Sequence, residues 1–138
     1  MKKAILLALC IILVVPLLAY AQCPNYEFGY QGQAQACIFG MVFPVVGAGV
    51  TLHDLNNAAN DISDVTDAAG NYAVSIKTNN CGRDFGFVTQ KWSVVIDTNA
   101  FGLPATKTCE AQADFICCCE QCVQSIIQTC SLLYKFCC

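Results

Sequence analysis

V-V-G-A-G-V-T-L (45–52) and V-T-D-A-A-G-N-Y-A-V-S-I (65–76) are the two stretches of sequence that decide the fold. In both, apolar side chains take every second position, which is the period of a strand with one buried face. The alternating residues are Val50, Leu52, Tyr72, Val74 and Ile76. Asp, Gly and Asn residues typical of turns lie between them. The pattern predicts two alternating strands around a tight turn, as in a hairpin of a β-sandwich.

Strand-like segments continue on both sides of this pair. Strands are predicted near 37–42, 48–54, 63–66, 72–77, 85–90, 92–97 and 105–111. I-F-G-M-V (38–42), G-A-G-V-T-L (47–52) and V-T-D-A-A-G-N-Y-A-V (65–74) resemble the carboxypeptidase regulatory-like domain, a transthyretin-like (prealbumin-like) secreted module. K-W-S-V-V-I-D (91–97) and the following A-F-G (100–102) resemble that family's late strand and aromatic-glycine turn. The resemblance implies a mainly β, transthyretin-like antiparallel β-sandwich, and it names a fold rather than a reaction.

Residues 1–21 have the features of a secretory signal peptide. Lys2 and Lys3 form the positive start, an apolar run follows, and A-Y-A (19–21) matches the cleavage motif. The mature chain is expected to begin at Gln22. Acylation of Cys23, as in a bacterial lipoprotein, is the alternative, and Gln22 fits that motif poorly. We expect no integral membrane span after cleavage, and a secreted or extracytoplasmic location, meaning the periplasm or cell surface in a bacterium.

The remaining chain divides into three predicted regions. Residues 22–36 are expected to form an N-terminal arm, and residues 37–113 the carboxypeptidase regulatory-like β-sandwich. Residues 114–138 are predicted to form a cysteine-rich amphipathic helix, with Asp114 as its N-cap and Lys135 in its last turn. That prediction depends on apolar residues spaced alternately three and four positions apart: Ile116, Cys119, Val123, Ile126, Cys130, Leu133 and Cys137.

Cysteine is abundant: the chain has 12, of which Cys10 lies in the predicted leader. In an oxidising compartment this density favours disulfides, and the candidates are Cys23, Cys37, Cys81, Cys109, Cys117, Cys118, Cys119, Cys122, Cys130, Cys137 and Cys138. The cluster at 117–122 contains one C-x-x-C, so a metal or Fe–S site and a reactive thiol are the alternatives. Cysteines on one helix rarely bridge one another. Bridges are therefore expected between body and tail. The surplus in the tail predicts either cross-linking between chains or a tail broken into two short helices that face each other.

Other candidate sites carry weaker signals. His53 is the single histidine, and no motif places a nucleophile beside it, so a surface histidine is favoured over a catalytic base. Transthyretin-like hydrolases use several histidines and a C-terminal tetrapeptide that this chain lacks. Asp61, Asp64 and Asp67 could gather oxygen ligands for calcium, but a solvated acidic loop is favoured. Most aromatic residues are expected in the core or an interface: Tyr26, Phe28, Tyr30, Phe39, Phe43, Phe85, Phe87, Trp92 and Phe101.

The net charge of −3 argues against nucleic acid as a partner, because phosphate binding requires a basic surface. We predict no enzyme activity, no catalytic residue, no metal and no cofactor. The favoured function is a secreted, non-enzymatic structural or adhesive subunit, disulfide-stabilised and cross-linked through its tail. Its partner would be a second copy or another extracellular protein. The alternatives are a small ligand- or calcium-binding module and a cysteine-based metal or redox protein.

Overall fold

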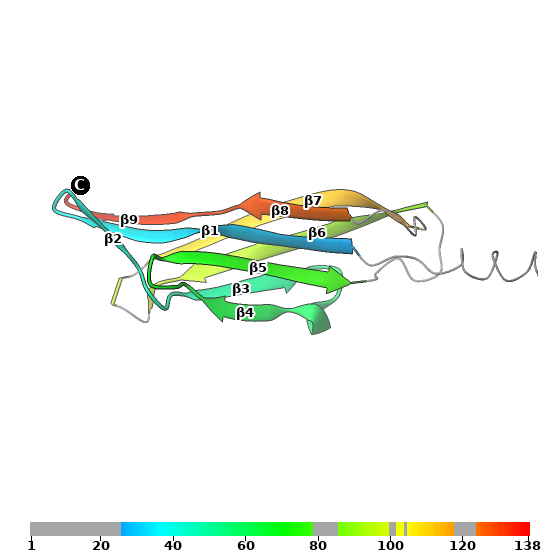
Figure 1. Cartoon of the computed structure of the whole chain (residues 1–138), viewed down its shortest axis with the longest axis horizontal. Coiled ribbons are helices and arrows are strands. Elements are labelled where there is room, and N and C mark those ends of the chain that lie inside the picture. Colours follow the sequence, from blue (N-terminus) through cyan, green and yellow to red (C-terminus); the bar gives the residue numbers. More distant parts are fainter. Residues whose placement is uncertain (1–25, 79–85, 100–101, 104, 118–123) are drawn as a thin grey trace, which may run out of the picture.

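The computed structural model describes residues 26–78, 86–99, 102–103, 105–117 and 124–138. This part is mainly β, with two sheets and one short 3₁₀ turn, η1 (Ala58–Asn60) (Figure 1). The strands are β1 (Tyr26–Ile38), β2 (Met41–Pro44), β3 (Gly49–Asp54), β4 (Ile62–Val65), β5 (Asn71–Thr78), β6 (Gly86–Asp97), β7 (Thr106–Cys117), β8 (Gln124–Thr129) and β9 (Leu132–Phe136). The predicted leader lies outside the described residues. Within them, no helix has the length and apolar character needed to span a membrane.

The first sheet is built around β1, its central strand. β5 lies antiparallel along the first half of β1, and β2 lies antiparallel along the second half, with Ala36 opposite Phe43. On the other side, β8 and then β9 run parallel to β1 in the same register. They therefore form one line that is interrupted at Cys130 and Ser131. Because this sheet is mixed, the prediction of a purely antiparallel sandwich is wrong here.

The second sheet is antiparallel throughout, in the order β4-β3-β6-β7. β6 and β7 pair along their whole length, from Gly86 opposite Cys117 to Asp97 opposite Thr106. β3 pairs with the last part of β6, and the short β4 pairs with β3 at the edge. From Gly86 on, the strands predicted at 85–90 and 92–97 are one strand, β6, because the ladder with β7 continues without a break between them.

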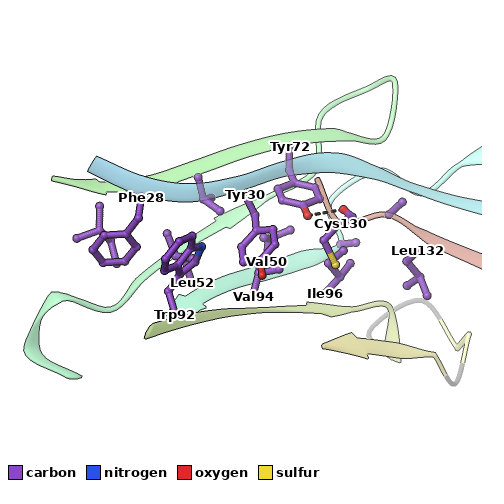
Figure 2. Packing of buried hydrophobic residues seen from close by; sticks show 14 of the residues in the cluster. Phe28, Tyr30, Val50, Leu52, Tyr72, Trp92, Val94, Ile96, Cys130 and Leu132 are labelled. Carbon is purple, nitrogen blue, oxygen red and sulfur yellow. Dashed lines mark hydrogen bonds between the residues drawn. The ribbon is translucent and has the colours of Figure 1, made fainter. Parts of the chain in front are cut away.

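The core lies between the two sheets and contains the alternating residues on which the fold prediction depends (Figure 2). These buried residues are Val50 and Leu52 on β3, and Tyr72, Val74 and Ile76 on β5. Trp92 on β6 has no exposed surface. Its Nε1 donates to the Gly29 carbonyl oxygen of β1 at 3.3 Å, so the indole joins the two layers. Side chains of alternate residues that interdigitate between two sheets are the packing expected of a sandwich.

The two decisive stretches do not pair with each other as a hairpin. β3 pairs with β4 and β6, whereas β5 pairs with β1 in the other sheet. The turn before β5 carries the chain from the second sheet to the first. In this turn Gly70 has φ 77°, and its N–H donates to the Asp67 carbonyl at 2.9 Å. Asp67 Oδ1 also accepts from the Asn71 N–H at 2.9 Å. The same turn residues serve a hairpin or a crossover, so the local pattern does not identify the partner strand.

The predicted C-terminal helix at 114–138 is wrong, because the described residues of this segment belong mostly to β7, β8 and β9. Ile126, Cys130 and Leu132 lie at even spacings. Ile126 and Leu132 align with the inward-facing Phe28 and Ala34 of β1, and Cys130 belongs to the buried core. Ile126 and Cys130 fit both a helical and a strand pattern. Pairing with β1 favours the strand, since it satisfies the backbone groups and buries the inner face together.

The predicted N-terminal arm contains the first part of β1. Tyr26, Phe28 and Tyr30 alternate along this strand, and all three are buried. The segment predicted as a strand at 37–42 instead contains the turn between β1 and β2, at Phe39 and Gly40. The sandwich therefore includes described residues on both sides of the predicted 37–113 body.

Candidate functional site

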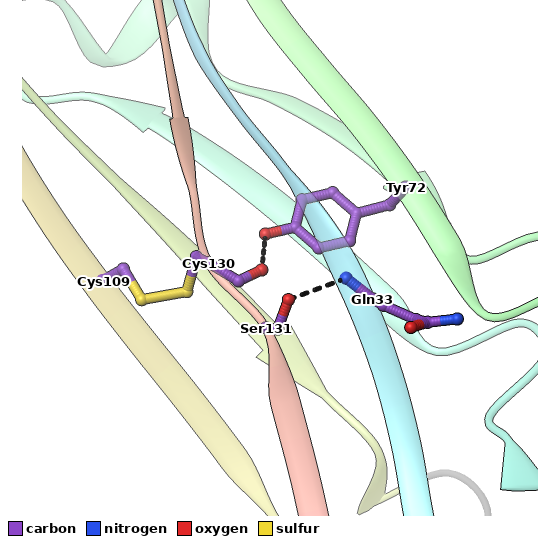
Figure 3. The surroundings of a disulfide bond; sticks show 5 residues. All are labelled: Gln33, Tyr72, Cys109, Cys130 and Ser131. Atoms are coloured by element: carbon purple, nitrogen blue, oxygen red, sulfur yellow. Dashed lines mark hydrogen bonds between the residues drawn. A yellow bond between two sulfur atoms is a disulfide. The ribbon is translucent and has the colours of Figure 1, made fainter.

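A buried disulfide joins the two sheets. Cys109 of β7 bonds to Cys130 at the interruption between β8 and β9, with the two Cα atoms 6.2 Å apart (Figure 3). Cys130 is buried in the core cluster. The bond ties a body cysteine to a cysteine of the segment after residue 114, and it fixes the interruption against the opposite sheet.

The interruption itself is held by three hydrogen bonds. The Cys130 N–H donates to the Gln31 carbonyl at 3.0 Å, and the Gln33 N–H donates to Ser131 Oγ at 3.1 Å. The Tyr72 hydroxyl, from β5, donates to the Cys130 carbonyl at 2.5 Å. Tyr72 reaches that carbonyl across β1, as Figure 3 shows. Burial, and after it the neighbouring Tyr30 hydroxyl, raises the pKa of Tyr72 to about 12.

Gly32 makes this crossing possible. It lies opposite Tyr72 in the β1–β5 register. A Cβ at this position would lie 1.9 Å from the Cys130 carbonyl oxygen, far inside van der Waals contact. Only glycine lets that carbonyl approach β1 while it accepts the Tyr72 hydrogen bond. The site is structural, and sequence analysis missed it because its members come from three segments that are far apart in the sequence.

A second disulfide joins Cys37 of β1 to Cys138, with the Cα atoms 6.1 Å apart. It attaches the C-terminal end to the central strand, and Cys137 beside it is an exposed free thiol. Both described bonds join a body cysteine to a tail cysteine. The remaining candidates, Cys23, Cys81, Cys118, Cys119 and Cys122 together with the Cys117 side chain, lie outside the described residues. So does most of the C-x-x-C cluster.

His53 lies on β3, where its Nδ1 is 2.7 Å from Asp61 Oδ2. Asp61 Oδ1 also accepts from the Asp54 N–H at 2.9 Å. Asp64 accepts from the adjacent Val65 N–H, and Asp67 belongs to the turn before β5. The three aspartates of the calcium hypothesis thus make separate local hydrogen bonds. Within the described ranges, no three His, Cys, Asp or Glu side chains converge as metal ligands.

A buried polar chain lies at one end of the sandwich. The Tyr26 hydroxyl donates to Gln90 Oε1 at 2.6 Å, and Gln90 Nε2 donates to Asp54 Oδ1 at 2.6 Å. Asp54 Oδ2 accepts from Asn60 Nδ2 at 2.9 Å. The chain links β1, β6 and β3 through side chains that have almost no exposed surface at Tyr26, Gln90 and Asp54. It specifies how the two sheets align, because each member needs its partners inside the core.

The aromatic residues divide into a buried and an exposed group. Tyr26, Phe28, Tyr30 and Trp92 are in the core, where Phe115 also stacks on Tyr26 at 4.3 Å between ring centroids. The exposed group contains Phe39, Phe43 and Phe87, together with Phe136, which the sequence analysis did not single out. Phe85 and Phe101 lie outside the described residues.

Among the described residues, several exposed apolar side chains lie together on what we call the overhang: β1 residues 34–38, the β1–β2 turn, β2 and β9. This end of the first sheet projects beyond the second sheet (Figure 1). Phe39, Met41 and Phe136 are 71%, 61% and 49% exposed. Their signal in the sequence was F-G-M-V-F-P-V-V (39–46), an apolar run without a charge.

The residues of the overhang show which face is uncovered. Phe43 aligns with the core residue Ala36, and Met41 and Phe136 both align with Ile38. Directly aligned residues of neighbouring strands share a face of the sheet. Met41, Phe43 and Phe136 therefore point to the side on which the second sheet covers the rest of β1. The overhang presents a core-type face without its covering layer.

An open depression on the molecule is a separate feature. It is lined by neutral side chains and backbone near the interruption: Gln31, Gly32, Gln33, Asn71, Tyr72, Thr129 and Ser131. These groups offer hydrogen bonds and no charge. No protein-family model and no curated protein matches this chain.

Proposed function

We propose that the protein is a secreted or extracytoplasmic, non-enzymatic structural or adhesive subunit, built on a transthyretin-like sandwich of the carboxypeptidase regulatory-like kind. The observation that carries the proposal is the overhang. Soluble monomers rarely expose large contiguous apolar patches, and such patches mark surfaces that contact a partner. Here the patch is on the sheet that Cys109–Cys130 ties to the second sheet, and Cys37–Cys138 ties the C-terminal end to its central strand.

The disulfides support the proposed compartment. Cys109–Cys130 joins the two sheets, and Cys37–Cys138 attaches the C-terminal end to the central strand. Disulfides with structural roles persist in oxidising compartments and are rare in the cytosol. The signal-like features of residues 1–21 agree with export through a membrane.

The test is export of the full chain with its own leader, followed by intact mass spectrometry with and without reductant and by sedimentation velocity. We expect a mature chain that begins at Gln22, a mass increase on reduction and alkylation that reports disulfides, and association that grows with concentration. Retention in the cytosol with reduced thiols would contradict the compartment. A protein that stays monomeric at high concentration would contradict the subunit role and favour a self-contained binding module.

A further inference from the structure

We infer that the overhang binds a second copy of this chain, with the inner faces of two overhangs stacked about a twofold axis. This inference depends on the proposed function, since it names the contact through which the subunits associate. Each overhang is half of a sandwich: one sheet with a core-type face and no second layer. Stacked face to face, two such halves supply each other's missing layer, as in an isologous interface.

The exposed area is close to what such a contact requires. For an aromatic side chain of about 200 Å², the exposed fractions of Phe39, Phe43 and Phe136, which are 71%, 44% and 49%, amount to roughly 330 Å². Met41, which is 61% exposed, adds about 120 Å² at the same reference area and raises the total to roughly 450 Å² per copy. A standard interface buries about 800 Å² per partner, of which somewhat more than half is apolar. The overhang therefore supplies most of the apolar share.

The turn at Phe39 gives an independent argument. Phe39 has φ 49° and Gly40 has φ 82°, and together they form the two-residue turn between paired Ile38 and Met41. Two positive φ values define a type I′ turn, which favours Asn or Asp before Gly. A bulky aromatic residue in the left-handed region is a strained choice that recurs at functional positions. The Phe39 ring packs edge-on against Phe136, with 5.6 Å between ring centroids, yet it remains 71% exposed. A contact outside the monomer adds to the interactions that offset this backbone cost.

Charge also favours a second copy. The chain is acidic, with a net charge of −3, so two copies repel over most of their surfaces. Lys135 is the only charged side chain of the overhang. The overhang is therefore a surface where two acidic copies can meet without opposing carboxylates.

The chain's own N-terminal residues are a poor occupant. β1 begins at Tyr26, at the end opposite the overhang, and the 13 residues from Tyr26 to Ile38 span about 40 Å. After cleavage at the proposed site, only residues 22–25 precede β1, and they reach about 14 Å. A second copy is not limited by the length of these residues and can approach the overhang directly.

Sedimentation equilibrium of the oxidised, exported protein tests the inference. Met41→Asp places a carboxylate on the stacked face, and we expect the dimer dissociation constant to rise by about 100-fold or more. Phe39→Asn removes the ring but suits the turn, and we expect a rise of about tenfold. The matched control is Phe87→Asp, since Phe87 is 73% exposed on β6 outside the overhang. It should change the constant less than about twofold.

Two further measurements keep the outcomes separate. Cys137→Ser removes the exposed thiol, and the dimer should persist in this variant because the contact is not covalent. Hydrogen exchange of the unmodified protein should show β2 and β9 becoming more protected as concentration rises. A dimer that is unaffected by Met41→Asp and Phe39→Asn, or that disappears with Cys137→Ser, would overturn the inference and leave the proposed subunit role standing. A protein that is monomeric throughout would overturn both.

Discussion

Replacement of Gly32 by alanine tests whether the contact between β1 and the β8–β9 interruption holds the sandwich together. The added Cβ would lie 1.9 Å from the Cys130 carbonyl oxygen and 2.7 Å from its carbon. Both are backbone atoms, and Cys130 is also bonded to Cys109 across the sheets. The carbonyl must therefore move, and it takes the acceptor of the Tyr72 hydroxyl with it.

Two costs add in this substitution. A buried hydroxyl that loses its acceptor costs about 1–3 kcal/mol, and insertion of a methyl group into a packed position costs about 1–3 kcal/mol. Replacement of a strand glycine by alanine raises the free energy of unfolding by roughly 0.5–1 kcal/mol, because glycine loses more backbone entropy on folding. We expect Gly32→Ala to lower the free energy of unfolding by about 3 kcal/mol.

Urea unfolding of the oxidised protein measures this loss against a matched control. In Gly49→Ala, the new Cβ would be 3.9 Å from the Asp97 carbonyl oxygen, an ordinary contact, so stability should stay equal or rise slightly. Tyr72→Phe supplies a double-mutant cycle: it should cost about 1–2 kcal/mol alone and much less in the Gly32→Ala background. Equal midpoints for the two alanine variants, or strictly additive losses in the cycle, would refute this account of the interruption.

Three other measurements follow from the structure. The raised pKa of Tyr72, from 10.0 to about 12, stabilises the fold fully below pH 10. That contribution should be lost between pH 10 and 12 at about 1.4 kcal/mol per pH unit, and urea titrations of Tyr72→Phe should show a smaller decline. Paired serine replacement of Cys109 and Cys130, 21 residues apart, should cost roughly 3 kcal/mol. The Cys37–Cys138 pair, 101 residues apart, should cost roughly 4–5 kcal/mol, and equal midpoint shifts would contradict the loop-length argument. Gln90→Leu removes the amide between the Tyr26 hydroxyl and Asp54, which should cost roughly 3 kcal/mol. The exposed control Gln128→Leu should leave the thermal midpoint unchanged, and a similar midpoint for both variants would mean that the buried chain contributes little.

The sequence predicted the inner part of the sandwich because the signal there is local. Val50 and Leu52 alternate with small or polar neighbours, and the structure buries both. Turn chemistry at Asp67 and Gly70 likewise located the end of one strand and the start of the next. Such features depend on residues close together in the chain, so a single sequence is sufficient to find them.

The strands at the two ends of the chain were harder to predict because they pair with each other. Tyr26 and Phe28 face the core on β1, and β8 pairs with them from about 98 residues away. Ile126 and Cys130 fit a helical spacing as well as a strand, and only their pairing with β1 decides between the two. The contact among Gly32, Tyr72 and Cys130 was missed for the same reason, since no local pattern joins three segments so distant in sequence.

The parallel pairing of β1 with β8 and β9 also sets the order in which the protein can fold. The central strand is synthesised first after the proposed leader, yet one of its edges has no partner until residues 124–136 arrive. An unpaired central edge exposes backbone groups that recruit other strands, and such long-range pairing is slow. The Cys37–Cys138 disulfide likewise cannot form until Cys138 has been synthesised. Formation of that bond therefore indicates that β9 has paired with β1. A chain truncated within β8 or β9 would leave one edge of β1 unpaired and prone to aggregation.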